Sequence, residues 1–158
     1  MTLKSVKDWI HELELERHPE GGWFRRVYES QQKVEEVRPA MTSIYYLLES
    51  SDFSALHRLK QDEQWHFYAG DPLTLHVIHP GGTVSEITLS AEGPFQTTVK
   101  AGHLFGATVD GDFALVGCTV APGFDYADFE LPSRASLLKD FPEHRNLILR
   151  LTRNQPRE

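Results

Sequence analysis

The sequence has almost no cysteine, since Cys118 is the single one among 158 residues. A disulfide within the chain is therefore excluded, and the apolar neighbours of Cys118 predict a buried, unreactive thiol in a strand. A chain without disulfides is typical of a reducing compartment. The segment 1–5 also lacks the apolar stretch of a secretory signal peptide, so we expect a cytoplasmic protein.

Long hydrophobic runs and basic clusters are missing too. No run approaches the roughly 18 apolar residues that cross a membrane as a helix, so no membrane partner is expected. The net charge is −7, and no basic cluster is longer than the pair Arg25 and Arg26. Nucleic-acid-binding proteins usually carry a basic patch, so no nucleic-acid partner is expected either. The share of hydrophobic residues, 40%, favours a folded chain over a disordered one.

What is present begins with one short helix. Apolar residues recur at helical spacing at Val6, Trp9, Ile10 and Leu13. Ser5 followed by Asp8 resembles a capping box. The segment 18–22, His-Pro-Glu-Gly-Gly, then ends the helix.

From there the pattern changes to about nine short strands, separated by turns rich in Gly, Pro and Asp. The expected strands are Trp23–Glu29, Thr42–Glu49, Ser54–Leu59, Gln64–Ala69, Leu73–His79, Val84–Leu89, Phe95–Lys100, His103–Val109 and Phe113–Val120. Such spacing is typical of a sandwich or a closed barrel. A short helix is expected near Ser133–Phe141, and Asn146–Leu151 is expected to be extended or helical. With no repeat and no linker, we expect one domain over residues 1–158.

The stretch 53–70 carries the residues of greatest chemical interest. Alternate side chains of a strand share a face, so Glu63, Trp65 and Phe67 point one way, and His66 and Tyr68 the other. If the two strands are adjacent, His57 and Glu63 meet inside the barrel. An imidazole beside a carboxylate is a plausible acid–base pair, because the carboxylate orients the ring and stabilises its charged form.

This stretch resembles the first motif of the cupins, G-x5-H-x-H-x3/4-E-x6-G. His57, Glu63 and Gly70 keep the spacing of the motif, whereas Leu59 replaces its second histidine and Ser51 its opening glycine. Of the second motif, G-x5-P-x-G-x2-H-x3-N, only Gly102 is retained. Phe105 stands at the position of the third metal-binding histidine, and Lys100 replaces the proline.

The resemblance is closer to a branch of small cupins known as a domain of unknown function, similar in fold to the dTDP-sugar epimerases. Four separated segments carry it, namely 18–22, 43–48, 62–65 and 121–124. The resemblance implies an all-β, RmlC-like jelly-roll barrel with a short N-terminal helix, and a homodimer. It also implies that the segment Glu20-Gly21-Gly22 borders the pocket, with Arg25 and Arg26 as candidates for an anionic substrate group.

Two of the metal-binding histidines of the cupin motifs are absent, and this bears on whether the protein holds a metal ion. A catalytic zinc usually needs three protein ligands, and His57 and Glu63 are only two, since Leu59 and Phe105 offer no donor atom. His103 faces the same way as Phe105 on a regular strand, but lies about 7 Å along it at roughly 3.4 Å per residue. No cofactor is therefore predicted, and a divalent metal held by His57, Glu63 and His103 remains the alternative.

Without a metal, the similarity to the epimerases implies His57 as the base that removes a proton next to a carbonyl, with Glu63 as its orienting carboxylate. Tyr46, Tyr68 and Tyr126 are open candidates for the acid. Tyr46, Trp65 and Phe105 are expected as pocket walls. His66, Tyr68 and His103 are further candidate substrate contacts, the first two only if a bulge turns them inward.

Three functions follow from these residues. The first is an isomerase or epimerase acting on a small polar, sugar-like molecule. The second is a non-catalytic protein that binds or senses a small ligand with the same pocket, and the third is a metal-dependent cupin enzyme. The fold alone does not choose among them, because one fold hosts many chemistries.

Overall fold

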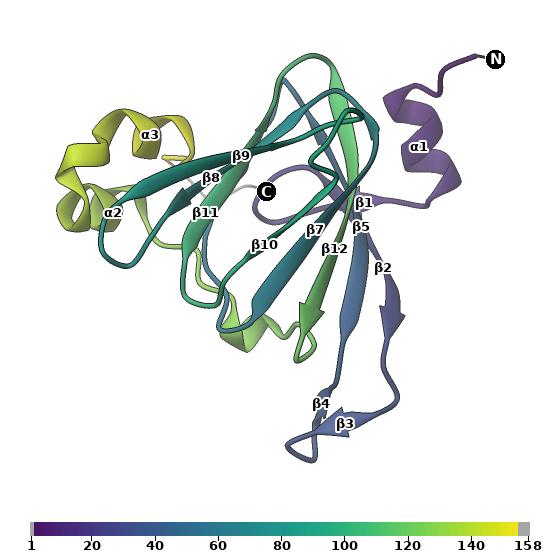
Figure 1. Cartoon of the computed structure of the whole chain (residues 1–158), viewed down its shortest axis with the longest axis horizontal. Helices are drawn as coiled ribbons and strands as arrows, with labels where there is room; N and C mark the ends of the chain where they lie inside the picture. Colours follow the sequence, from purple (N-terminus) through teal and green to yellow (C-terminus); the bar gives the residue numbers. More distant parts are fainter. Residues whose placement is uncertain (1, 155–158) are drawn as a thin grey trace.

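Two β-sheets face each other in the computed structural model of the chain, which describes residues 2–154 (Figure 1). Within that range a six-stranded sheet has the order β1-β2-β5-β12-β7-β10, and a four-stranded sheet has the order β6-β11-β8-β9. The first consists of β1 (Glu16–Arg17), β2 (Trp23–Glu29), β5 (Thr42–Glu49), β12 (Phe113–Ala121), β7 (Asp62–Gly70) and β10 (Gln96–Val99). The second consists of β6 (Ser54–His57), β11 (Leu104–Val109), β8 (Leu73–Ile78) and β9 (Val84–Leu89). The strand spacing predicted an all-β sandwich or barrel and the resemblance implied the barrel, and this fold class is confirmed.

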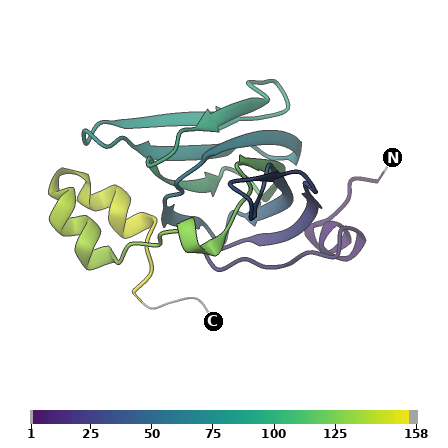
Figure 2. The ribbon, with the colours of Figure 1, turned by 90° about the horizontal axis from the view of Figure 1, so that it is seen from below.

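Short elements complete the structure. A small hairpin extends from the end of β2 (Figure 1), and helices lie at opposite sides of the barrel, α1 on one side and α2 with α3 on the other (Figure 2). Their bounds are β3 (Lys33–Val34), β4 (Arg38–Pro39), α1 (Val6–Glu12), the 3-10 turns η1 (Tyr126–Asp128) and η2 (Pro142–His144), α2 (Arg134–Asp140) and α3 (Arg145–Arg150). In residues 2–154 no helix has both the length and the apolar character needed to cross a bilayer.

The helix ends follow from local chemistry. The predicted capping box of α1 is present, since the Ser5 side chain accepts from the Asp8 backbone and the Asp8 side chain accepts from the Ser5 backbone. Ser133 caps α2 in the same way, accepting from the backbone of Ser136. The last segment, left open as extended or helical, is the helix α3.

The inner faces of the sheets form the core and leave room for a cavity at one end. Along β7, Glu63 and Trp65 are buried, while Gln64 and His66, which alternate with them, are only partly so. This alternation matches the predicted one. On the facing sheet, His57 of β6 lies directly opposite Phe105 of the neighbouring strand β11. The barrel therefore sets β6 and β7, neighbours in the sequence, into opposite sheets that face each other.

Nine strands were expected and all nine are present, three of them with the predicted bounds: β2, β5 and β9. The two-residue strands β1, β3 and β4 were missed, because such short segments have no periodicity to detect. The predicted homodimer and cytoplasmic location stay predictions.

Candidate functional site

A cavity of about 570 Å³ opens between the two sheets. Its volume lies in the usual range for a small-molecule site, roughly 300–1,000 Å³. The residues that line it are His18, Glu20, Phe24, Arg26, Glu29, Lys33, Val37, Pro39, Thr42, Ile44, Tyr46, His57, Leu59, Glu63, Trp65, Cys118, Val120, Phe124, Asp125, Tyr126 and Phe129. Apolar walls thus surround a few charged groups, of which His18, Glu20, His57 and Glu63 are buried.

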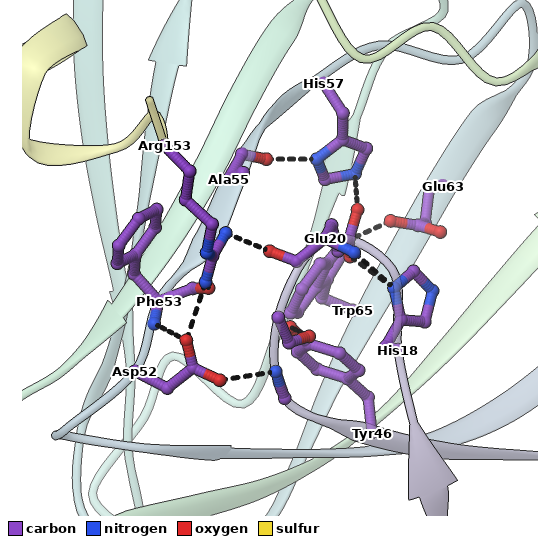
Figure 3. Close-up of polar contacts among 12 residues, drawn as sticks. His18, Glu20, Tyr46, Asp52, Phe53, Ala55, His57, Glu63, Trp65 and Arg153 are labelled. Atoms are coloured by element: carbon purple, nitrogen blue, oxygen red, sulfur yellow. Dashed lines mark hydrogen bonds and ion pairs between the residues drawn. The ribbon is translucent and has the colours of Figure 1, made fainter. Parts of the chain in front are cut away.

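His57 is held by two partners in this cavity (Figure 3). Its Nδ1 lies 2.7 Å from the carbonyl oxygen of Ala55, so Nδ1 carries a hydrogen and donates it. Its Nε2 lies 2.9 Å from Oε2 of Glu20. A carboxylate beside Nε2 favours a proton there as well, so the arrangement is that of an imidazolium paired with a carboxylate.

The pKa values of the two groups move in the directions expected for such a pair. Burial lowers the pKa of His57, but the charge of Glu20 opposes this and the pKa ends above its ordinary value. Burial raises the pKa of Glu20, and the positive charges of His57 and His18 bring it below its ordinary value. At neutral pH the buried pair is therefore ionic.

Glu20 presents its buried carboxylate to the cavity. Its Oε2 faces Nε2 of His57 at ion-pair distance. Because Glu20 lines the cavity and a carboxylate oxygen can accept more than one hydrogen bond, a ligand hydroxyl or N–H group can bind beside His57.

Glu63 faces the same cavity from β7 and is 8% exposed. Its Oε1 accepts a hydrogen bond from Nε1 of Trp65 at 2.8 Å. Burial raises the pKa of Glu63 and the negative charge of Glu20 adds to this, while the attraction of His57 and the hydrogen bond from Trp65 lower it, so the resulting pKa is about 7. A group with this pKa is present in both protonation states near neutral pH, which suits proton transfer.

The loop that carries Glu20 depends on its two glycines. Gly21 and Gly22 have φ values of +116° and +78°. A Cβ atom on Gly21 would lie 1.9 Å from the carbonyl oxygen of Phe53, so a side chain there would push the loop out of the cavity. The Tyr46 hydroxyl donates to the carbonyl oxygen of Gly21 at 2.7 Å and holds the loop from inside.

The structure brings together four of the residues expected at the site. His57, Glu63, Tyr46 and Trp65 all line the cavity. Phe105 packs against His57, with ring centroids 4.2 Å apart, but lies behind it rather than among the lining residues. Of the two arginines, Arg26 lines the cavity, whereas Arg25 forms an ion pair with Glu14 at 3.0 Å.

Three other expected contacts lie elsewhere. His66 and Tyr68 are on the outer face of β7, and the register shift of β7 against β12 falls at Tyr68 without turning it inward. The Tyr68 side chain is 54% exposed and packs near Gly117 and Tyr45. His103 precedes β11, which begins at Leu104, and its ring contacts His79.

The orienting carboxylate of His57 was assigned to the wrong residue. Glu20 lies at ion-pair distance from the ring, whereas Glu63 bonds to Trp65. The segment Glu20-Gly21-Gly22 had been expected to border the pocket, but the loop has no strand alternation from which to tell where Glu20 points. Phe129, with its ring centroid 5.5 Å from that of His57, was missed for the same reason.

The donor set does not fit a catalytic metal. Over residues 2–154, no group of three or more His, Cys, Asp or Glu side chains is arranged to hold a metal ion. The structure does not bring together the alternative set of His57, Glu63 and His103, because His103 lies outside the cavity.

This geometry leads to a prediction on metal content. Protein purified without an affinity tag should carry less than about a tenth of a metal ion per chain, because a catalytic site usually needs three protein ligands. Elemental analysis before and after dialysis against a chelator measures this. A stoichiometric metal lost together with ligand binding would contradict it.

Comparison with known families and structures agrees with this architecture. The family model described as Cupin superfamily (DUF985) matches residues 7–132. A search of curated proteins found no match.

Among solved structures, a protein of Shewanella oneidensis has 39% identity and a TM-score of 0.93, covering 97% of this chain and 100% of its own. A hypothetical protein from Leishmania major has 38% identity and a TM-score of 0.88, covering 94% and 99%. An oxalate decarboxylase of Bacillus subtilis has 14% identity and a TM-score of 0.60, covering 90% and 40%, and at this identity the likeness concerns the fold alone.

Proposed function

This chain belongs to the DUF985 family of the cupin superfamily, and from that premise we propose that it is an isomerase or epimerase acting on a small polar, sugar-like molecule. The observation that carries the proposal is that a carboxyl group with a pKa of about 7, Glu63, shares a buried cavity with the His57–Glu20 ion pair. Pairs of titratable groups whose environments push their pKa values apart are typical of acid–base sites.

Glu63 is the proton acceptor in this proposal. His57 was expected to be the base, but Nδ1 donates to Ala55 and Nε2 lies against Glu20, so no nitrogen lone pair is left for a substrate. The carboxylate of Glu63 is ionised in about half of the molecules near pH 7 and lines the cavity. His57 instead supplies a fixed positive charge.

The proposed step breaks a C–H bond next to a carbonyl group. The proton moves to Glu63, and the electron pair moves through the new C=C bond onto the carbonyl oxygen, where the charge of His57 stabilises it. Return of a proton to the same carbon from the opposite side inverts the centre, and no oxidant or reductant is needed. We assign the returning proton to Tyr126, because Tyr46 already donates to Gly21 and Tyr68 lies outside the cavity.

The substrate class follows from the lining. Glu20 and Glu63 offer buried carboxyl oxygens to hydroxyl donors, and the walls around them are apolar or aromatic, including Phe124 and Phe129. A small hydroxy-carbonyl compound matches both features, with its hydroxyl groups on the carboxylates and its carbon skeleton against the rings.

Exchange of substrate hydrogen for solvent deuterium tests the proposal. Small aldoses, ketoses and hydroxy-ketones are incubated with the protein in deuterated water, and loss of the exchangeable C–H signal is followed by proton NMR. We expect exchange with at least one of these compounds, and His57→Ala is expected to slow it by about 10²–10³-fold through loss of the positive charge.

His79→Ala is the matched control, because His79 binds Ser85 and lies outside the cavity. Its exchange rate should equal that of the wild type. Thermal stabilisation by a compound that shows no exchange would favour the binding protein and contradict the enzyme. Full exchange in folded His57→Ala would contradict the role of His57.

A further inference from the structure

The loop 18–22 that carries Glu20 is clamped from the far end of the chain, and we propose that Arg153 is a positioning residue that holds the Glu20 carboxylate against His57. The positioning of Glu20 by Arg153 is independent of the proposed function, and only its importance for catalysis rests on that function. Arg153 itself does not line the cavity.

Arg153 binds the loop through one nitrogen of its guanidinium group and the segment Asp52–Phe53 through another (Figure 3). Its Nη1 donates to the carbonyl oxygen of Glu20 at 2.9 Å. Its Nη2 donates to Oδ1 of Asp52 at 2.6 Å and to the carbonyl oxygen of Phe53 at 3.0 Å. The guanidinium carbon also lies 3.9 Å from the ring centroid of Phe53. The arginine is thus fixed in orientation by four contacts.

Asp52 completes the clamp on the other side of the loop. Its Oδ2 accepts from the backbone N–H of Gly22 at 3.0 Å, while its Oδ1 accepts from Arg153. The backbone N–H of Ala55 donates to the same Glu20 carbonyl oxygen at 2.8 Å. The loop is therefore held at Glu20 and at Gly22, on both sides of Gly21.

Such a clamp matters because two adjacent glycines follow Glu20, even though hydrogen bonds between His18 and residues 20–22 also support the loop. Gly21 and Gly22 adopt positive φ, and glycine loses more conformational freedom on ordering than any other residue. A catalytic group displaced by about 1 Å can lose about 10²-fold in rate, so a carboxylate on a glycine loop needs fixed support. The forked guanidinium reaches several acceptors at once, which the single ammonium of lysine does not.

The sign of the expected effect separates positioning from simple charge. Glu20 and Glu63 both raise the pKa of His57, from the loop and from β7. Removing the positive charge of Arg153 would by itself raise the pKa of His57, because a like charge is lost. Loss of the clamp moves Glu20 away and lowers that pKa instead. The two explanations therefore predict opposite shifts.

The experiment titrates His57 by NMR of its ring Cε1–H group in the full chain, without a ligand. Arg153→Met is expected to lower the pKa of His57 by about 1–3 units, the usual effect of a nearby opposite charge, and Glu20→Gln by a similar amount. The double variant should show no further decrease. Arg153→Lys should fall between the wild type and Arg153→Met.

Arg150→Met is the matched control, because Arg150 lies near His76 rather than the loop, and it should leave the titration of His57 unchanged. If Arg153→Met does not fold, Arg153→Lys keeps the positive charge but loses the forked contacts, and it should lower the same pKa. An unchanged or raised pKa of His57 in a folded clamp variant would overturn the proposal. Absence of deuterium exchange in the wild type would instead contradict the proposed enzymatic activity. The conclusion drawn from the titration of His57 would still hold.

Discussion

Glu20→Gln is expected to slow the deuterium exchange of the substrate by about 10²–10³-fold, the usual cost of losing one group that stabilises transition-state charge. Glutamine keeps the length of the side chain and an oxygen acceptor, but it removes the charge that holds His57 in its protonated form. In the variant the burial of His57 lowers its pKa with opposition from Glu63 and the Ala55 carbonyl but no longer from Glu20, so a smaller share of the rings is charged at pH 7. Wherever the ring is neutral, the carbonyl oxygen lacks a positive partner.

The measurement compares kcat for exchange with the titration of His57 in the same sample. Glu14→Gln is the matched control, because Glu14 pairs with Arg25 away from the cavity, and its kcat should equal that of the wild type. A Glu20→Gln protein that keeps the wild-type kcat while His57 titrates lower would show that the charge of His57 plays no part.

The strand residues of the site were predictable, and the loop residues were not. Alternation along β7 places Glu63 and Trp65 on one face and His66 on the other, which is where the structure has them. Glu20 has no such constraint. Its position depends on Arg153, which is 133 residues away in the sequence, and no local pattern reports a contact of that separation.

Strand alternation also predicts where a side chain points but not what it bonds to. His57 was correctly expected to face the interior, yet its partner was taken to be Glu63 on the strand that follows in the sequence. The structure puts β6 and β7 into opposite sheets, so Glu63 bonds to Trp65 of its own strand and Glu20 reaches His57 from the loop. The prediction that His103 contacts the substrate was based on its place in a strand, and β11 begins one residue later than predicted, at Leu104.

Glu63→Gln should show that the proposed base lowers the stability of the protein above neutral pH. The pKa of Glu63 is about 7 in the folded state, against an ordinary 4.5 that is appropriate to the unfolded chain. Between these values the folded state binds a proton that the unfolded state has released, so the free energy of unfolding falls as pH rises from about 4.5 to about 7. At about 1.4 kcal/mol per pKa unit, the full loss is about 3 kcal/mol.

Glutamine removes this loss, because it stays neutral and its oxygen can accept the hydrogen bond from Trp65. At pH 8 the variant is therefore expected to be more stable than the wild type by about 3 kcal/mol, and at pH 4 the two should be nearly equal. Exchange activity should meanwhile fall by about 10²–10⁴-fold, because the proton acceptor is gone. Denaturant unfolding at the two pH values gives the first quantity, and NMR exchange gives the second.

The control is Glu92→Gln, an exposed residue of the turn before β10, which should show no difference in stability between the two pH values relative to the wild type. A Glu63→Gln protein that is less stable than the wild type at pH 8 would mean that the carboxylate is stabilised in the fold, and the argument for a proton acceptor near neutral pH would fail with it. Greater stability together with lost exchange is the combination expected when a buried carboxylate is retained for its chemistry, because the folded protein then bears the cost of a charge that only the reaction uses.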